Sequence, residues 1–116
     1  MATQLPLTLH QSNDEVLDLI ITPVVATDDL SLITELRFYL KPDVCVADTD
    51  STVTVLTSAV PAQITITAQS STQILATVYI PASALVDPYS RVWRIDAYAG
   101  LTKRTAMYGP VAVIDL

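Results

Sequence analysis

The sequence predicts an all-β protein, an antiparallel β-sandwich of seven to nine strands in which residues 1–116 form a single domain. Three observations support this class. Valine, isoleucine and threonine, which pack well on a pleated sheet, make up 37 of the 116 residues. Apolar and polar side chains alternate with a period of two in several short stretches. No stretch predicts the long helices that alternate with strands in a parallel α/β protein.

The first strands are expected in the amino-terminal third. In LPLTL the alternation puts Leu5, Leu7 and Leu9 on one face. EVLDLIITPVV fits helical spacing as well, but its β-branched residues and Pro23 favour a strand of about eight residues. ITELRFYLK is the clearest strand: its apolar face holds Leu36, Phe38 and Leu40, and its polar face holds Glu35, Arg37, Tyr39 and Lys41.

The later strands follow from QITITA, ILATVYI and RVWRIDAYA, which alternate in the same way. In the last of these, Trp93, Ile95 and Ala97 are expected to point inward. The outward side chains there are Arg94, Asp96 and Tyr98. The alternation as a whole predicts a core that includes Leu36, Phe38, Ile66, Val78, Trp93 and Ile95.

The turns rely on residue types other than glycine, of which the chain has two. Most of the seven prolines fall at the ends of the alternating runs, where the missing N–H breaks no ladder. Aspartate, serine and proline are expected to form most of the turns. AYAGLTKR predicts a hairpin in which Gly100 takes a positive φ, and PASALVDP predicts a helical turn led by Pro81.

Residues that carry out chemistry are few, so we predict no catalytic residue, cofactor or metal, and no enzyme. His10 is the one histidine, no GxSxG nucleophile motif is present, and a zinc site needs more His or Cys ligands than the chain has. The acidic pairs at 28–29 and 48–50 offer oxygen ligands but lack the calcium-loop pattern. Cys45 is expected to be a buried thiol that forms no disulfide.

The charge distribution argues against two kinds of partner. The net charge is −6, with −7 on residues 1–58 and +1 on residues 59–116. An acidic chain repels phosphate, so nucleic acid is not an expected partner. No apolar run is long enough to span a membrane, and the opening MATQLPLTLHQ lacks the pattern of a secretory leader. We therefore expect synthesis in a cytoplasm and no membrane partner.

The basic residues gather in one segment, since residues 91–110 hold four of the six. One interpretation is a set of solvated hairpin charges. The other is a docking surface that meets an acidic partner, for which the candidates are Arg94, Tyr98, Lys103 and Arg104. In a homo-oligomer the acidic turns would supply the opposite charges, from Asp28, Asp29, Asp48 and Asp50.

Several segments resemble immunoglobulin-like domains of tailed-phage virion proteins, such as the amino-terminal domain of baseplate upper proteins. These segments are LPLTLHQSNDEVLDLIITP, DLSLITELRFYLKPD, ATVYIPASALVDPYSRVWRIDAYAG and MYGPVAVIDL. The stretch ALVDPYSRVWRIDAYAG is also similar to the E–F corner of fibronectin type III modules, in which Tyr89 would be the corner tyrosine. The resemblance implies an immunoglobulin-like sandwich and no catalytic residues.

The resemblance further implies a non-enzymatic structural protein of the virion, made in the host cytoplasm. It would be a capsid decoration, a neck or connector protein, or a tail or baseplate component, and its partners would be other virion proteins and further copies of itself. The alternative is a stand-alone adhesion or carbohydrate-binding sandwich. In that case Tyr39, Tyr79 and Tyr98 would form an exposed aromatic platform.

Overall fold

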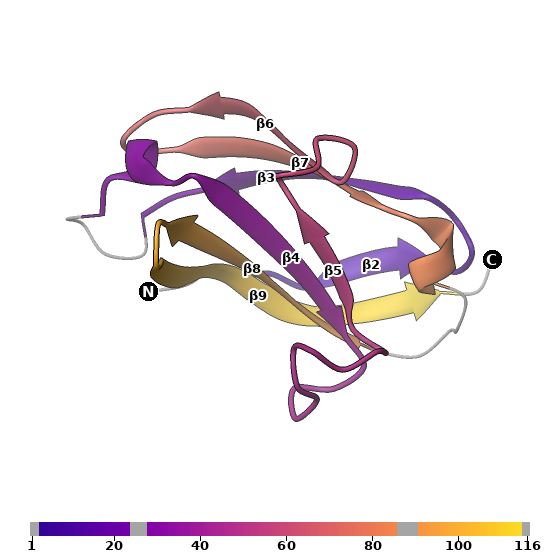
Figure 1. Ribbon diagram of the computed structural model, residues 1–116. Coiled ribbons are helices and arrows are strands. Elements are labelled where there is room, and N and C mark those ends of the chain that lie inside the picture. Colours follow the sequence, from indigo (N-terminus) through magenta and orange to yellow (C-terminus); the bar gives the residue numbers. More distant parts are fainter. Residues whose placement is uncertain (1–2, 24–27, 86–90, 115–116) are drawn as a thin grey trace.

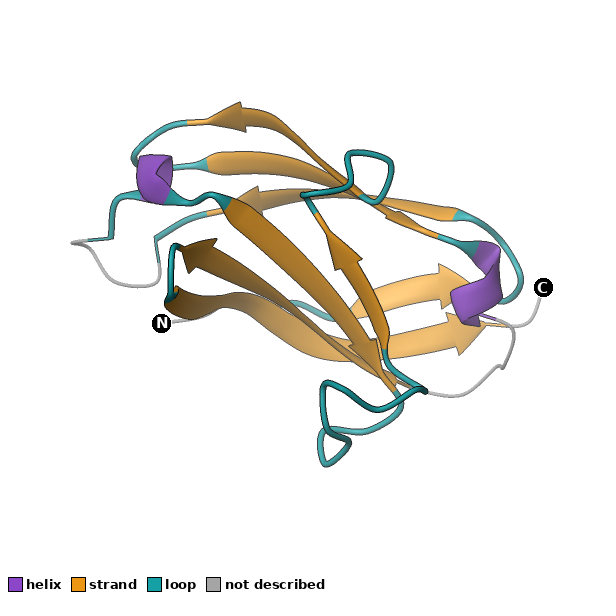
Figure 2. Cartoon of the chain, in the orientation of Figure 1, coloured by secondary structure: helices purple, strands orange, loops and turns teal. Residues whose placement is uncertain are grey.

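The computed structural model describes residues 3–23, 28–85 and 91–114, which form two β-sheets packed face to face (Figures 1 and 2). The larger sheet contains β1 (Thr3–Gln4), β2 (Leu7–His10), β4 (Glu35–Lys41), β5 (Thr54–Thr57), β8 (Arg91–Ala99) and β9 (Thr102–Ile114). The smaller sheet contains β3 (Glu15–Ile21), β6 (Ile64–Gln69) and β7 (Ile74–Ile80). Two single 3-10 turns, η1 (Leu30–Leu32) and η2 (Ala82–Leu85), complete the regular structure. The prediction of an all-β, two-sheet protein is confirmed.

The strand order places the first strands beside the last one. The larger sheet runs β1-β9-β8-β4-β5, with β2 also paired to β9, and the smaller sheet runs β3-β7-β6. All pairs are antiparallel except those of β1 and β2 with β9, which are parallel. The ambiguous EVLDLII segment is therefore a strand, paired with β7 without a break from Glu15 to Ile21.

The core lies between the sheets and is built from the side chains that the alternation placed inward. Leu36, Phe38, Val78, Trp93 and Ile95 are all buried, as predicted. The rings of Phe38 and Trp93 stack with their centroids 5.6 Å apart. The predicted burial of Ile66 is only partial, because this residue lies on the edge strand β6, directly before a shift in register.

The junction between β1 and β2 passes close to β9. The Leu5 N–H donates to the Tyr108 carbonyl at 2.8 Å, and the Leu5 carbonyl accepts from Trp93 Nε1 at 2.9 Å. A Cβ on Gly109 would overlap the Leu5 carbonyl oxygen, so glycine is required where the strands cross. Leu5, which was expected on the same face as Leu9, differs from it in burial: Leu9 is buried, whereas the Leu5 side chain is exposed and its carbonyl accepts from Trp93.

The turns are formed largely by aspartate, as the low glycine content predicts. Asp29, Asp43 and Asp50 each accept a hydrogen bond from the backbone N–H two residues later. Gly100 joins β8 to β9 with φ of 61°, so the predicted hairpin is confirmed. The helical turn after Pro81 is confirmed as η2.

Two expectations about particular residues have different outcomes. Cys45 is exposed, so its predicted burial is wrong: it lies in the connection from β4 to β5, where its N–H donates to Asp43, and not on an inward-facing strand position. Tyr89, the expected corner tyrosine, lies outside the described residues.

Candidate docking surface

The outer face of the larger sheet carries most of the residues proposed for docking. Strand β4 presents Tyr39 opposite Arg94 of β8, and β8 presents Tyr98 opposite Lys103 of β9. These side chains share the face because paired residues of neighbouring strands point to the same side of a sheet. Arg104 pairs instead with the inward-pointing Ala97 and therefore lies on the other side. The structure thus brings three of the four candidates together and separates the fourth.

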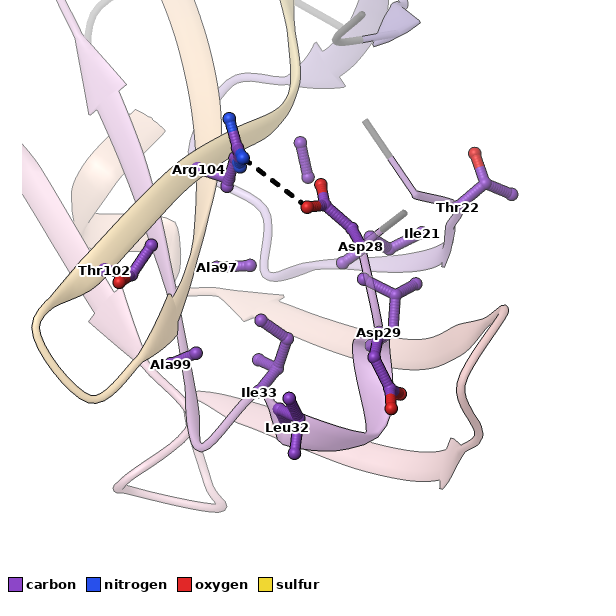
Figure 3. A pocket seen from close by; sticks show the side chains of 12 residues that line it. Ile21, Thr22, Asp28, Asp29, Leu32, Ile33, Ala97, Ala99, Thr102 and Arg104 are labelled. Carbon is purple, nitrogen blue, oxygen red and sulfur yellow. Dashed lines mark ion pairs between the residues drawn. The ribbon is translucent and has the colours of Figure 1, made fainter. Parts of the chain in front are cut away.

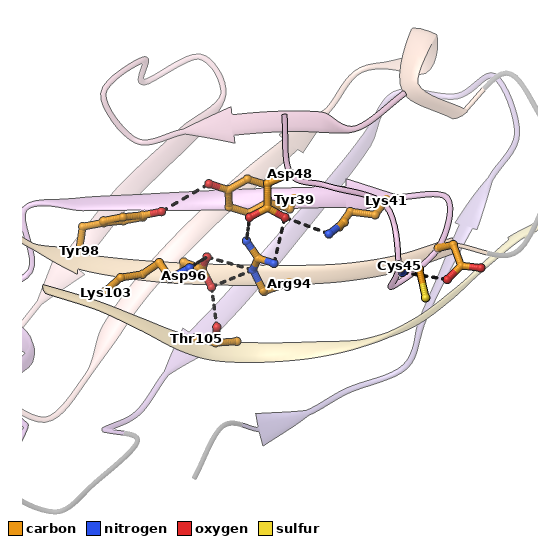
Figure 4. Close-up of polar contacts among 10 residues, drawn as sticks. Tyr39, Lys41, Cys45, Asp48, Arg94, Asp96, Tyr98, Lys103 and Thr105 are labelled. Atoms are coloured by element: carbon orange, nitrogen blue, oxygen red, sulfur yellow. Dashed lines mark hydrogen bonds and ion pairs between the residues drawn. The ribbon is translucent and has the colours of Figure 1, made fainter. Parts of the chain in front are cut away.

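Arg94 is the centre of this face (Figure 4). Its guanidinium donates to both carboxylate oxygens of Asp48, at 2.6 and 3.2 Å, and its Nε donates to Asp96 at 2.9 Å. The same group lies 4.3 Å from the centre of the Tyr39 ring, within the range of a cation–π contact. Burial opposes the charged form, but the two carboxylates outweigh it and raise the pKa of Arg94.

Asp48 reaches the sheet from the connection between β4 and β5. Besides Arg94 it accepts from Lys41 Nζ at 2.9 Å, and this lysine is nearly buried. Hydrogen bonds first from Arg94 and then from Lys41 lower the pKa of Asp48 to about 2. The carboxylate therefore holds the connection between β4 and β5 against the outer face through two charged groups, Lys41 and Arg94.

Asp96 departs most clearly from its expected environment. Its position in the alternation is outward, as predicted, yet its side chain is 0% exposed. Arg94 and Thr105 cover it and donate to it, the threonine hydroxyl at 2.8 Å, and Lys103 Nζ lies 3.9 Å away. The long side chains of neighbouring strands thus bury a carboxylate that alternation alone places in solvent.

Tyr98 lies at the far end of the same face, beside the start of β4. Its hydroxyl is 3.4 Å from that of Tyr39, and the guanidinium of Arg37 lies 4.6 Å from the centre of its ring. Burial and then the contact with Tyr39 raise the pKa of Tyr98 to about 12. Tyr98 is therefore a neutral phenol throughout the physiological range.

Arg104 lines a pocket of about 270 Å³ at the end of the sandwich that carries the β8–β9 hairpin (Figure 3). Its Nη2 lies 3.5 Å from Asp28 Oδ1, across the mouth of the pocket. The lining is mostly apolar and comes from both sheets, with Ile21 from the smaller sheet and Ala97 from the larger. The ion pair therefore links the β8–β9 hairpin to the segment before η1.

The acidic turns contact the basic residues within a single chain. Asp48 binds Arg94, and Asp28 lies against Arg104. Asp29 and Asp50 accept hydrogen bonds within their own turns. Two of the four carboxylates that were expected to face another copy, Asp28 and Asp48, thus pair with basic groups of the same chain. The spacing of Arg94 and Asp96 predicted the ion pair between these two residues. No sequence pattern predicted that Asp48 would reach Arg94 or that Asp28 would reach Arg104.

His10, the single histidine, pairs with an acidic side chain at the surface. His10 Nδ1 lies 2.9 Å from Glu15 Oε1 at the surface, where the His10 N–H also donates to that oxygen. Within residues 3–23, 28–85 and 91–114, no three His, Cys, Asp or Glu side chains are placed to hold a metal ion. The described helical turns are also too short to cross a membrane.

No model of a known protein family and no curated protein sequence matches this chain.

Proposed function

We propose that this chain is a non-enzymatic structural protein of a tailed-phage virion, a single immunoglobulin-like sandwich that docks on the capsid, neck or tail. The strand order supports the immunoglobulin-like part of the proposal, and the virion role rests on the resemblance described in the sequence analysis. A three-stranded sheet β3-β7-β6 faces a sheet β9-β8-β4-β5, as strands B-E-D face G-F-C-C′ in immunoglobulin domains. The early strands β1 and β2 lie parallel to β9, which extends the second sheet.

The core differs from that of antibody domains in a way that fits synthesis in a cytoplasm. Antibody domains join the two sheets by a disulfide, whereas this chain has one cysteine, the exposed Cys45. In the core, Phe38 and Trp93 of the larger sheet are buried and stacked on each other. Burial of these aromatic rings stabilises the core and, unlike a disulfide, does not require an oxidising compartment.

The tyrosine platform of the carbohydrate-binding alternative does not form. Tyr39 is 6% exposed and lies beneath the guanidinium of Arg94. Tyr79 belongs to β7, in the smaller sheet, and Tyr98 to β8, in the larger. A sugar ring therefore has no shared surface on which to stack against all three, and the expectation of such a platform is wrong.

The protein content of purified particles tests the proposal. Phage particles from an infected host are separated on a density gradient, and this chain is quantified by mass spectrometry beside a phage replication protein that serves as the control for carry-over. We expect this chain to follow the particle peak in fixed proportion to the capsid protein while the replication protein stays behind. If both proteins are removed to the same extent, the virion proposal is wrong.

The contribution of the basic hairpin to docking is tested separately. Lys103 and Arg104 have side chains that are about half exposed, and the double variant Lys103→Glu, Arg104→Glu reverses their charge. Because the new carboxylates lie beside Asp96 and Asp28, Trp93 fluorescence must first show that the variant is folded. Binding to particles that lack the protein is measured at low and high salt. If the hairpin docks, the variant loses occupancy, and the loss is larger at low salt. Equal occupancy at both salt concentrations would place docking elsewhere.

A further inference from the structure

Strand β3 is an edge strand with one open side. In the part of the chain that the structure describes, β7 is the one strand that pairs with β3, and it does so without interruption from Glu15 to Ile21. In an antiparallel pair, alternate residues direct their backbone N–H and C=O groups away from the partner strand. The second side of β3 therefore presents a row of backbone donors and acceptors to which no described strand is bonded.

The other edges of the two sheets carry features that discourage pairing. Strand β5 is four residues long, β6 has a register shift between Ile66 and Ala68, and Pro6 separates β1 from β2. Short strands, bulges and prolines are devices by which proteins protect a sheet edge. Strand β3 has seven residues, a continuous register and no proline, so it lacks all three.

The strand order accounts for the open edge. In the ABED sheet of immunoglobulin constant-type domains, strand A lies beside strand B. Strand β3 takes the place of strand B in that order, but the early strands β1 and β2 pair with β9 of the other sheet. The smaller sheet thus ends one strand earlier. Leu17 of β3 packs against the core and yet is only half-buried at this edge.

The charge around this edge is of one sign. The first 36 residues contain no lysine or arginine and six acidic residues, which are Asp14, Glu15, Asp18, Asp28, Asp29 and Glu35. Strands β6 and β7 contain no charged residue, so the charges of the smaller sheet are those of Glu15 and Asp18. Glu15 pairs with His10, whereas Asp18 is exposed in the middle of β3 and accepts from the Thr77 hydroxyl. The edge therefore presents a carboxylate and no basic group.

Apolar side chains flank this carboxylate. Val16 and Ile20 lie two residues before and after Asp18, on the same outer side of the sheet, and each is 58% exposed. Residues directly opposite one another on neighbouring strands are close enough for their side chains to interact. A strand added beside β3 would therefore be matched by a basic residue opposite Asp18 and by apolar residues opposite Val16 and Ile20.

We propose that the open edge of β3 binds an extended segment of a partner protein in which a lysine or arginine lies between two apolar residues, each two positions away. Backbone hydrogen bonds to β3 supply the pairing, and the side chains opposite Val16, Asp18 and Ile20 select the segment. A second copy of this chain fits less well, because β3–β3 pairing brings two acidic edges together and each copy has a net charge of −6. The inference concerns the isolated chain, so it does not depend on the virion proposal.

Titration of the isotope-labelled chain with a synthetic peptide, followed by NMR, tests the proposal. The probe is a capped heptapeptide in which threonine alternates with valine, lysine and valine. We expect amide shifts to change along β3, and the β3 amides that do not donate to β7 to exchange with solvent more slowly in the complex. The absence of any change along β3 up to about 5 mM peptide, beyond the range of a millimolar Kd, would overturn the proposal.

Two further peptides separate the backbone from the charge. Proline in place of the two threonines beside the lysine keeps the charge but prevents strand pairing. Glutamate in place of the lysine keeps the extended backbone but reverses the charge. Both peptides should bind more weakly than the lysine peptide. Equal binding of the proline peptide would contradict pairing at the edge, and equal binding of the glutamate peptide would contradict a basic partner.

Two variants of the protein form a matched pair. Asp18→Asn removes the carboxylate but keeps an acceptor for Thr77, and we expect it to weaken binding of the lysine peptide about twofold to fivefold. Asp43→Asn changes the net charge equally in an exposed turn outside the smaller sheet, so its affinity should stay near that of the wild type. Equal weakening by both variants would overturn the pairing opposite Asp18. Trp93 fluorescence establishes that each variant is folded.

Sedimentation equilibrium of the chain without peptide tests the competing occupant. We expect the mass of a monomer and rapid exchange of the open β3 amides. If the mass doubles and the same amides are already protected, a second copy of the chain occupies the edge and the proposal is wrong.

Discussion

The crossing of the amino-terminal strand over Gly109 gives the sharpest prediction about stability. In Gly109→Ala the new Cβ would overlap the Leu5 carbonyl oxygen, and it would lie 2.7 Å from the Leu5 carbonyl carbon and 3.1 Å from Trp93 Nε1. The neighbours are backbone and a buried ring, so neither can move aside cheaply. The substitution must therefore push residues 3–6 away from β9 and separate the Leu5 carbonyl from the Trp93 indole.

The size of the effect follows from two terms. Inserting one methyl group into a packed site costs about 1–3 kcal/mol. Leaving the indole N–H of Trp93 buried without its acceptor costs about 1–3 kcal/mol more. We expect Gly109→Ala to lower the free energy of unfolding by about 2–6 kcal/mol, a large part of the roughly 5–15 kcal/mol that a domain possesses. Urea titration followed by the fluorescence of the single tryptophan measures this change.

Two comparisons isolate the steric cause. Gly100→Ala makes the same change where no atom lies within 4 Å, and its cost is the backbone strain of a positive φ, about 1–2 kcal/mol. In a chain that lacks residues 1–5, alanine at 109 no longer overlaps the Leu5 carbonyl and keeps only the 3.1 Å approach to Trp93 Nε1, so most of its effect should disappear. The reasoning is refuted if Gly109→Ala costs no more than Gly100→Ala, or if its cost is unchanged after the truncation.

Three further predictions concern the core and the outer face of the larger sheet. Trp93→Ala removes the stacking on Phe38 and should cost about 3–5 kcal/mol in urea unfolding; a cost below about 1 kcal/mol would contradict its central position. The lowered pKa of Asp48 means that its stabilisation is present above 3.8 and is lost as the pH falls through about 2. Asp48→Asn should therefore have a lower free energy of unfolding near neutral pH than the wild type, and it should lose less of that free energy in acid. If the free energy of unfolding depends on pH in the same way in both proteins, the Asp48 carboxylate does not stabilise the fold through Arg94. The raised pKa of Tyr98 means that its stabilisation is present below pH 10 and is lost as the pH rises through about 12. Phenolate absorbance should show one tyrosine that ionises at higher pH than an ordinary tyrosine, and this step should be missing in Tyr98→Phe.

Much of the sheet structure was predictable because alternation is a local property. A strand with one buried face must place every second side chain inward, so Leu36 and Phe38 could be assigned from ITELRFYLK alone. The hairpin at Gly100 could be predicted in the same way, because a hairpin turn favours a residue with positive φ and the chain has only two glycines. These features depend on neighbours in the sequence.

The outer face could not be predicted, because burial there depends on contacts between distant segments. Alternation placed Asp96 and Tyr39 outward, and both point outward, yet side chains from other strands cover them. The approach of Asp48 depends on the path of the twelve residues from 42 to 53, which no periodicity describes. Cys45 was misplaced for the same reason, since a cysteine's usual preference for burial says nothing about a particular loop.

The central claim is that this sandwich acts by docking on a tailed-phage particle, and an image reconstruction of that particle tests it most directly. We expect density on the capsid, neck or tail into which the two sheets fit as one body, with a protein surface covering part of the domain. Particles that carry no such density, and from which the chain is absent, would contradict the claim.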